Sequence, residues 1–448
     1  MVYLDYSATS PLLPEARAAM LAAMDFVGNP SALHTPGHMA MNAIEEAREE
    51  IAKLINANPE EIIFTSGGSE SNNTVTNIFA GQPVAVSAIE HPSLLDSARL
   101  RCKATIIPVD ESGRVAEQLF SPTSAVATGG GKAESDFVAH LATTGAFLRS
   151  EPRNDGSEQA SAKKSAFSLV SIMLANNEIG TINDIKKLAK EAHAAGALFH
   201  TDATQALGKI RIDVKDLDVD YMTISAHKIG GPVGIGALYV KKGSPYKPFI
   251  LGGHQEKGRR AGTYQTVNIA GFGAAAKYAN DHKTWELYEK NIRPLRDKLA
   301  NRILNDIPYS SINGISPFEG PKTWASAPER PEKGAYAVYA TTLPNILNCS
   351  FEAAEGESIQ LYLDAEGGII TSTGSACASG DGKPSHVIMA TRNDAEIAHS
   401  SVRFSFGLDA KKSDIDHVMK FLPDIVKRLQ GISTLKAGKI TKEDSYYA

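Results

Sequence analysis

An α/β fold built around a mostly parallel sheet is the architecture that this sequence predicts. Between about residues 40 and 260, helical patterns alternate with short β-branched or apolar runs, as they do in doubly wound sheets. The C-terminal third differs, because a helical pattern at 284–307 is followed by strand-like runs at 345–351 and 401–405. A chain of 448 residues can hold one large core and a second, smaller one. We therefore expect a large α/β domain and a smaller α+β domain.

The first elements of the large domain are an amphipathic helix at 40–54 and a strand at 61–65, which leads through a Ser/Gly turn into a second helix. The charged residues of the first helix are expected to form a solvated face: Glu45, Glu46, Arg48, Glu49 and Glu50. Further strands are expected at 84–87, 168–173, 197–201, 221–225 and 236–240. Ligands bind beyond the carboxyl ends of such strands, where Ser69, Asp202 and Lys228 fall.

Two segments interrupt this pattern and are interpreted as surface insertions. Residues 121–166 are rich in Gly, Ala and Ser, and residues 317–339 are rich in Pro, Glu and Lys. The Gly-Gly-Gly-Lys run at 129–132 is not a P-loop, because its spacing differs and no Ser or Thr follows the lysine. We expect the large domain to span 15–264, with the insertion at about 121–166, and the small domain to combine 1–14 with 265–448.

The composition is that of an ordinary globular protein, with 42% hydrophobic and 22% charged residues. A net charge of -5 gives no reason to expect direct binding to nucleic acid. No apolar run approaches the roughly 20 residues that span a bilayer, and the N-terminus has no signal-peptide pattern, so we expect a cytoplasmic protein without a membrane partner. Three cysteines are too few and too scattered for a disulfide framework or a zinc site, so no metal is expected.

A lysine and an aspartate at two strand ends carry the main chemical signal. Lys228 follows an apolar strand and precedes a glycine-rich turn, and a buried lysine tends to be deprotonated or used as an imine. Asp202 ends another strand about twenty residues upstream. A lysine that can form a Schiff base, with an acid that can face a pyridinium nitrogen, is what pyridoxal phosphate needs from a protein. Taken singly, Lys228 is equally consistent with a solvated strand-end lysine and Asp202 with a helix N-cap.

The segment 65–72 joins a strand to a helix through small residues. Free N–H groups at the helix start, with the Ser69 hydroxyl, would hold a phosphate. An ordinary serine N-cap after a glycine turn is the alternative for this segment. Ser225 and His227, beside the lysine, are candidates for further phosphate contacts.

With these residues in place, the sequence closely resembles the cysteine desulfurases of the NifS/IscS type, a branch of the class V aminotransferase superfamily. The matching blocks run nearly end to end: 3–9, 28–31, 64–72, 90–91, 176–180, 200–208, 225–240, 261–263, 344–350, 374–377 and 401–405. The resemblance implies a fold type I pyridoxal phosphate enzyme that converts L-cysteine to L-alanine and leaves a persulfide on the protein. The two inserted segments lie outside it.

The resemblance also assigns site residues. Lys228 is similar to the Schiff-base lysine and general base, Asp202 to the acid at the ring nitrogen, and His91 to the histidine over the ring. The positions that match other cofactor contacts are Gly68, Ser69, Asn177, Gln205, Ser225 and His227. Thr263 matches a threonine that the second subunit of a homodimer lends to the phosphate. Arg403 matches the arginine whose guanidinium binds the substrate carboxylate through two hydrogen bonds, and Asn29 and Asn177 match positions beside the substrate.

Cys377 decides the reaction that this resemblance implies. It lies in a polar, flexible-looking segment at 371–383, whereas Cys102 and Cys349 lie in or beside apolar runs and are expected to be inert core thiols. The length of the loop after Cys377 is typical of members that deliver sulfur to an acceptor protein, such as an iron–sulfur scaffold or a tRNA-thiolation enzyme. The tail at 430–448 lacks the longer Trp-containing extension of some members, which leaves the acceptor and its pathway open.

Two other readings compete with a cysteine desulfurase. A selenocysteine lyase or a class V aminotransferase would share the cofactor residues without needing a nucleophilic cysteine. A non-catalytic interaction protein of the same fold would not need Lys228, Asp202, His91, Arg403 and Cys377 together.

Overall fold

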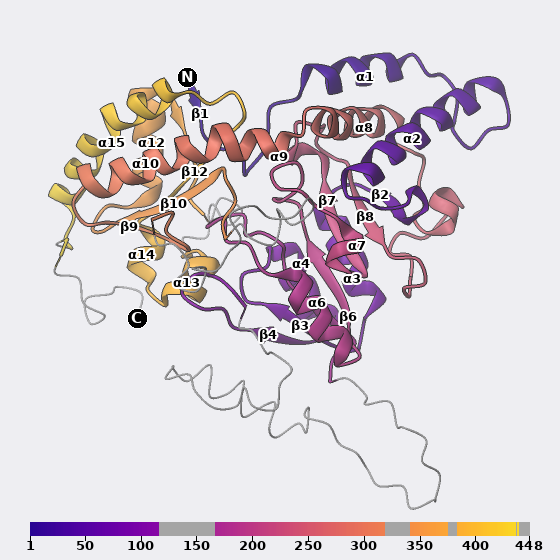
Figure 1. The fold of residues 1–448 in the computed structure, drawn as a ribbon, viewed down its shortest axis with the longest axis horizontal. Helices are drawn as coiled ribbons and strands as arrows, with labels where there is room; N and C mark the ends of the chain where they lie inside the picture. The colour runs from indigo at the N-terminus through magenta and orange to yellow at the C-terminus, as the bar shows by residue number, and fades with distance from the viewer. Residues whose placement is uncertain (116–165, 319–340, 375–382, 436, 439–448) are drawn as a thin grey trace, which may run out of the picture.

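The computed structural model describes residues 1–115, 166–318, 341–374, 383–435 and 437–438. Most of the two expected insertions, 121–166 and 317–339, lies outside these residues. Figure 1 shows the seven-stranded sheet in one part of the molecule and the C-terminal elements gathered in the other, with the N-terminus on the C-terminal side. No helix among the described residues is both long and apolar enough to pass through a bilayer.

The larger part contains a sheet in which four neighbouring strand pairs are parallel. In spatial order its strands are β2 (Ile62–Thr65), β8 (Gly236–Val240), β7 (Tyr221–Ser225), β6 (Leu198–Asp202), β5 (Leu169–Ser171), β3 (Pro83–Ser87) and β4 (Lys103–Ile107). Only β8 runs antiparallel to its neighbours β2 and β7. The expected α/β class with a mostly parallel sheet is therefore confirmed. Sequence reasoning missed β4, a partly exposed edge strand that begins with a lysine.

Helices cover both faces of this sheet, because strand residues point alternately to opposite sides. On β2, Ile62 and Phe64 pack in one core while Ile63 packs in another. The helices of this part are α1 (Pro14–Met24), α2 (Thr35–Leu54), α3 (Gly68–Ile78), α4 (Pro92–Arg101), α6 (Ile185–Ala194), α7 (Val214–Leu217) and α8 (Thr266–Asp281). The first core takes residues from α2, α6, α7 and α8, and the second from α3 and α4.

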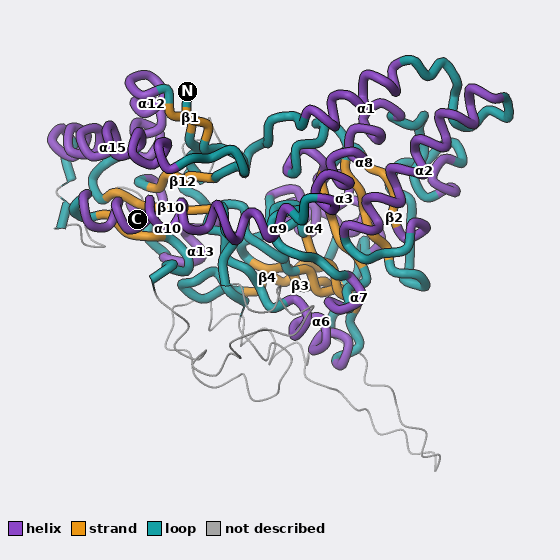
Figure 2. The backbone as a smooth tube through the Cα atoms, turned by 45° about the horizontal axis from the view of Figure 1, so that its top comes forward, coloured by secondary structure: helices purple, strands orange, loops and turns teal. Residues whose placement is uncertain are grey.

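The smaller part has its own hydrophobic core, to which the chain's first residues contribute Leu4. Its strands are β1 (Val2–Tyr3), β9 (Ser310–Ile312), β10 (Ile346–Phe351), β11 (Ile369–Ile370) and β12 (Ser401–Ser405). Its helical segments are α9 (Thr284–Leu287), a π-helical turn at Tyr288–Ile292, α10 (Arg293–Asp306), α12 (Gly356–Gly367), α13 (His386–Arg392), α14 (Ala395–His399) and α15 (Lys412–Ile432). Figure 2 shows these elements as a lobe beside the sheet.

The division between the two cores differs from the expected boundary at residue 264. Helix α8 lies beyond that boundary, yet Ile269, Phe272 and Ala276 pack in the first core against α1 and α2. The second core begins in this region at Tyr288. The change of core therefore falls after α8, because the apolar residues of α8 complete the layer that α1 and α2 form over the sheet.

Arg48 corrects the expectation that the charged residues of the first helix are all solvated. Its side chain is 6% exposed and forms a bidentate ion pair with Glu256, at 2.7 and 2.8 Å. Glu256 also accepts a hydrogen bond from the Phe64 N–H of β2, at 3.0 Å. This pair fastens the loop before α8 to α2 and to the edge of the sheet, although its two residues are 208 positions apart in the sequence.

Arg48→Met should lower the free energy of unfolding by about 3–5 kcal/mol, because the change leaves the Glu256 carboxylate buried without its partner. Glu45→Gln is the matched control, since Glu45 binds the same guanidinium from a half-exposed position and its loss should cost less than about 1 kcal/mol. Urea denaturation measures both. Equal and small effects would show that the Arg48–Glu256 pair contributes little.

Candidate active site

Three chain segments meet beyond the carboxyl ends of the central strands. Strands β6 and β7 are parallel, with Asp202 opposite Thr223, so the ends of both strands lie at one edge of the sheet. Lys228 follows three residues after β7, in the short helical turn Ala226–Lys228. Helix α3 begins at Gly68, shortly after β2 ends. The strand–turn–helix connections therefore place a lysine, a carboxylate and a helix N-terminus around one site.

Hydrogen bonds hold Lys228 at its side-chain amine and at its main-chain carbonyl group. Its Nζ donates hydrogen bonds to the carbonyl oxygens of Ser7 and Ala8, the second at 2.7 Å. Its own carbonyl oxygen accepts from Ser10 Oγ at 3.1 Å and from Lys209 Nζ at 3.2 Å. These contacts fix the direction of the lysine side chain and tie the N-terminal segment to the sheet.

Asp202 is a buried carboxylate whose two oxygens are both engaged. Oδ2 accepts from Asn72 Nδ2 and Oδ1 accepts from the Thr204 N–H, each at 2.9 Å. Two residues earlier, His200 lies between the hydroxyls of Ser171 and Thr223. Burial lowers the pKa of His200 to about 4, so this ring is neutral near pH 7. The neutral His200 ring therefore does not pair with Asp202 as a cation, and the Asp202 carboxylate can face a cation in the cavity.

Two histidines of the site are neutral near pH 7. His91 is the N-cap of α4, where its Nδ1 accepts the Ser93 N–H at 3.1 Å, so the remaining ring proton is on Nε2. Burial is the largest cause that lowers the pKa of His91. Burial, followed by the positive charges of Lys228 and Lys209, lowers the pKa of His227 to about 4. Each neutral ring therefore has one N–H that can donate a hydrogen bond and one ring nitrogen that can accept one.

The start of α3 forms an anion cradle. The N-cap is Gly67, whose φ of 149° is far more accessible to glycine than to other residues, and no side chain caps the helix. A Cβ at Gly236 of β8 would lie 2.8 Å from Gly67 Cα, so glycine is also needed where the two segments cross. The N–H groups of the first turn of α3 are thus left for a ligand.

Arg403 of β12 reaches the site from the smaller part of the molecule. Its guanidinium donates to the carbonyl oxygen of Asn177 and to Asp5 Oδ1, each at 3.0 Å. The side chain is 4% exposed, and its Nε has no hydrogen-bond partner among the described residues. Asp5 is the carboxylate that pairs with this guanidinium among the described residues, and the Nε–H that is left can help to bind a substrate carboxylate.

These groups surround a cavity of about 350 Å³. The expected residues that line it are Gly68, Ser69, His91, Asn177, Asp202, Gln205, Ser225, His227, Lys228 and Arg403. Asn29 and Thr263 are exposed, and neither lines the cavity within one chain. Cys377 lies outside the described residues. Sequence reasoning missed Asn72 and Thr204, for which the available signal was a polar residue in the first turns after a strand that ends at the site.

The donor set fits pyridoxal phosphate. Gln205 Oε1 and Thr204 Oγ1 are buried beside the cavity and have no hydrogen-bond partner among the described residues. Such buried polar atoms are costly unless a ligand or water satisfies them. A ring with polar substituents, a phosphate and an aldehyde would meet the amide, the open helix N-terminus and the lysine in one cavity.

Both flanks of residues 375–382 are fastened beside this cavity. Gly374 lines it, and a Cβ there would lie 2.2 Å from Glu178 Oε2. The same Glu178 oxygen accepts from Ser385 Oγ at 2.5 Å, and the His386 ring bonds the Glu90 carbonyl oxygen at 3.0 Å. Burial raises the pKa of Glu178 to about 7. Gly374 and Ser385, which lie on either side of Cys377 in the sequence, are therefore both placed next to the site.

The other two cysteines behave as expected for core thiols. Burial raises the pKa of Cys102 to about 11 and raises the pKa of fully buried Cys349 further. Neither lines the cavity. A thiol in such surroundings stays protonated near pH 7 and is a poor nucleophile.

Glu90, which precedes His91, is a buried carboxyl that has no cationic partner in the described part of the chain. Its Oε1 accepts from Ser87 Oγ and from the Met173 N–H at 2.7 Å, whereas Oε2 has no partner among the described residues. Burial raises the pKa of Glu90 to about 8. The site is therefore supported by a carboxylic acid that keeps its proton near neutral pH.

Comparison with known proteins gives consistent matches along the whole chain. The family model described as aminotransferase class-V matches residues 2–127, 150–319 and 330–418. The cysteine desulfurase IscS of Dictyoglomus turgidum is 37% identical, with 97% of each chain covered. Among solved structures, a NifS-like protein from Rickettsia africae has a TM-score of 0.73 at 28% identity, covering 95% of this chain and 99% of its own. The structure titled SspA in complex with cysteine has a TM-score of 0.65 at 27% identity, covering 91% and 99%.

Glu90→Gln should change how stability depends on pH. A carboxyl whose folded pKa is about 8, above the ordinary 4.5, contributes stability below pH 4.5 that is lost as pH rises through 8. Between pH 5 and 8 the wild-type protein should therefore lose on the order of 3 kcal/mol relative to the variant. Urea denaturation at both values measures this, with exposed Glu111→Gln as control. Parallel pH dependence in all three proteins would contradict an ionisable, buried Glu90.

Proposed function

The chain belongs to the class V aminotransferase family, and we propose that it acts as a cysteine desulfurase on L-cysteine. Pyridoxal phosphate is the cofactor, and the products are L-alanine and a persulfide on Cys377. The observation that carries the proposal is one cavity that joins Lys228, Asp202 and the Arg403 fork. The full-length similarity to enzymes named cysteine desulfurase supports the choice of reaction over that of a lyase or aminotransferase.

The cofactor would be held at four points. The start of α3, with Ser69, Ser225 and His227, would hold the phosphate, and Lys228 would hold the aldehyde carbon. Asp202 would hold the proton of the ring nitrogen, and His91 would lie against the ring. Bound in this way, pyridoxal phosphate supplies an electron sink for bond cleavage at the substrate Cα.

The remaining steps depend on protein side chains. Arg403 binds and orients the substrate carboxylate, and Asp5 keeps the guanidinium in place. Lys228 moves the proton at the substrate Cα, and the neutral His91 ring has one donor and one acceptor for further proton transfers. The Cys377 thiolate attacks the substrate sulfur, so that an S–S bond forms while the Cβ–S bond breaks. The fastened flanks at Gly374 and Ser385 support Cys377 as the residue that reaches this cavity.

The sulfur acceptor and the assembly belong to the same proposal. A persulfide on a segment next to an open cavity suits delivery to a protein acceptor, such as an iron–sulfur scaffold or a tRNA-thiolation enzyme. We place the reaction in the cytoplasm, where thiols remain reduced. The active unit is a homodimer, in which Thr263 reaches the phosphate of the partner subunit.

The loop that carries Thr263 is well placed for this role. Arg260 forms a bidentate pair with Glu70 of α3, at 2.9 and 3.1 Å, which holds the loop next to the helix that begins at Gly68. Thr263 itself is exposed in one chain. Contact across a two-fold interface would use this exposed hydroxyl without moving the loop.

Cys377→Ser should separate cofactor binding from desulfuration. Visible absorbance of the bound cofactor should remain, because the cavity is unchanged, while alanine release should fall by about a thousandfold or more, since a hydroxyl cannot take up sulfur as a persulfide. Lys228→Ala should lose both the absorbance and turnover. Cys102→Ala should keep full turnover, since Cys102 is remote from the cavity.

The measurements are cofactor absorbance, alanine release and mass spectrometry of the trapped sulfur adduct. Full turnover by Cys377→Ser, or an adduct on Cys102 or Cys349, would contradict Cys377 as the nucleophile. Full turnover by Lys228→Ala would contradict the cofactor assignment itself.

Thr263→Val should weaken binding of pyridoxal phosphate roughly tenfold, through loss of one hydrogen bond to a charged group. Mixed dimers distinguish the two subunits. Inactive Lys228→Ala subunits still carry Thr263, so mixing them with Thr263→Val subunits should restore one complete site per mixed dimer. No restoration, with the same weak cofactor binding as the Thr263→Val dimer, would place Thr263 outside the partner's site.

A further inference from the structure

A second cavity shares Lys228 in its lining with the site described above. It has a volume of about 390 Å³, within the range of small-molecule sites. Residues of both cores line it, among them Leu207 and Ile229 from the first and Tyr288 and Leu408 from the second. It therefore lies at the junction of the two parts of the molecule, which is a common place for ligand sites.

Lys209 places a buried amine in the wall of this cavity. The lysine is 1% exposed, and its Nζ donates to the carbonyl oxygen of Lys228 at 3.2 Å. Among the described residues it forms no ion pair with a carboxylate. Burial, followed by repulsion from Lys228, lowers the pKa of Lys209 to about 7. A buried amine with a neutral acceptor as its partner is a costly arrangement that an anion would relieve.

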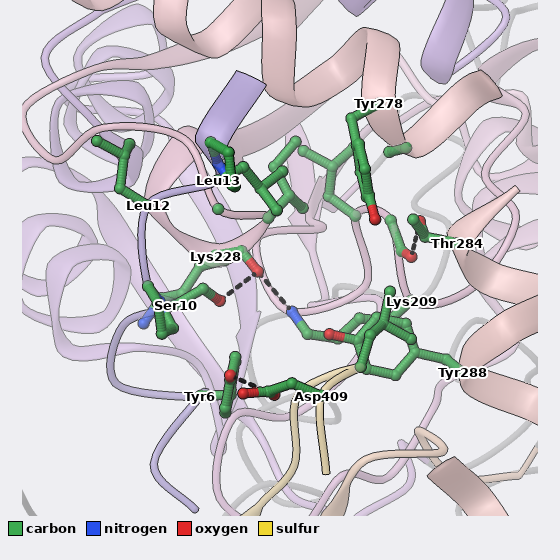
Figure 3. Close-up of a pocket in the computed structure, with 18 residues that line it drawn as sticks. Tyr6, Ser10, Leu12, Leu13, Lys209, Lys228, Tyr278, Thr284, Tyr288 and Asp409 are labelled. Carbon is green, nitrogen blue, oxygen red and sulfur yellow. Dashed lines mark hydrogen bonds between the residues drawn. The ribbon is translucent and has the colours of Figure 1, made fainter. Parts of the chain in front are cut away.

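Most of the remaining wall is apolar or aromatic. Figure 3 shows Lys209 directed toward Lys228, with Tyr278, Tyr288 and Leu13 around the same space. The carboxylate in the lining is Asp409, which is exposed and accepts a hydrogen bond from Tyr6 Oη at 2.5 Å. The negative charge of Asp409 thus faces solvent and a phenol, whereas the positive charge of Lys209 is buried.

We propose that this second cavity is a binding site for a small monocarboxylate with an apolar body. The carboxylate accepts from Lys209 Nζ, and the apolar body lies between Leu13, Leu207 and Tyr288. Neither the cofactor nor L-cysteine needs this cavity, so the site is additional to the proposed reaction.

A ligand bound in the second cavity can affect the active site through the main chain of Lys228. The Lys228 carbonyl oxygen accepts from Lys209 and from Ser10, and both of these residues line the second cavity. A carboxylate at Lys209 shares the ammonium, which has three N–H donors, with that carbonyl and weakens the hydrogen bond between them. Ligand binding therefore changes the support of the main chain at Lys228.

The test uses 3-phenylpropionate and its uncharged amide as probes, with the cofactor-loaded protein and calorimetry or saturation-transfer NMR as the measurement. The carboxylate should bind at pH 6.5, and Lys209→Met should weaken it at least tenfold while leaving the amide unchanged. Lys215→Met removes an exposed lysine six positions away and should change nothing. Ala279→Met, which narrows the cavity without altering charge, should weaken both probes.

The wild-type pH profile gives a readout that does not depend on any variant. Because Lys209 must be protonated, the dissociation constant of the carboxylate should be constant from about pH 5.5 up to the pKa of Lys209 and rise about tenfold per pH unit above that pKa, while that of the amide stays flat. Burial lowers this pKa in the cofactor-loaded protein as well, whereas the repulsion from Lys228 is absent once Lys228 holds the cofactor. The other titratable groups here are Lys228, His227, Tyr6, Tyr278, Tyr288 and Asp409. His227, with a pKa of about 4, stays neutral, and the raised pKa values of Tyr6 and Tyr288 keep them protonated.

Three outcomes would overturn the proposal. They are equal affinity of the two probes, unchanged carboxylate binding in a folded Lys209→Met protein, and no saturable binding of either probe up to about 10 mM. Full turnover in the Cys377 or Lys228 variants would contradict the proposed reaction and leave this result untouched, so failure of the second site and failure of the proposed reaction are distinguishable.

Discussion

The parallel pairing of β6 and β7 is the constraint on which the site depends. Its register sets Asp202 opposite Thr223, so that the acid and the chain that turns into Lys228 leave the sheet at one edge. A register shift of one residue would send Asp202 to the opposite face, since side chains alternate along a strand. The antiparallel β8 then returns along β7 and brings Gly236 against Gly67, which positions the start of α3. Acid, amine and anion cradle thus follow from one set of strand pairings.

The second requirement is that the smaller part of the molecule closes over that edge. The buried Arg403 on β12 forms an ion pair with the partly buried Asp5 in the N-terminal segment, and the same segment supplies the carbonyl groups that bind Lys228 Nζ. An ion pair of this kind is not strong evidence for stability. Its value here is positional, because it joins the chain's beginning and end at the cavity and leaves one side of the guanidinium for a substrate. The same closure encloses the second cavity around Lys209.

Much of the fold and the site could be predicted from the sequence because the signals are local. Strand ends carry Asp202 and Lys228, and small residues mark the start of α3, so each was identifiable without knowing any contact. Arg48 was assigned to solvent because its charge pattern is that of an exposed helix face, and its partner Glu256 is 208 residues away. Helix α8 was assigned to the smaller domain because a helical pattern does not state which core it joins. Asn29 and Thr263 are exposed and do not line the cavity, because matching blocks of sequence do not state how far a residue lies from a site.

The pairing of Asp5 with Arg403, 398 residues apart, has a consequence for how the protein is made. A chain emerges from the ribosome from its N-terminus, and early domains fold first. The sheet can form once β8 has emerged. The N-terminal strand β1, however, pairs with β11, which is synthesised much later. Asp5 pairs with β12, which is synthesised later still. Throughout most of translation the first residues remain unpaired, and the cofactor cavity lacks one wall. Binding of the substrate carboxylate is thereby postponed to the end of synthesis, so a nascent chain that stalls before β12 would present the sheet and its cofactor contacts without Arg403.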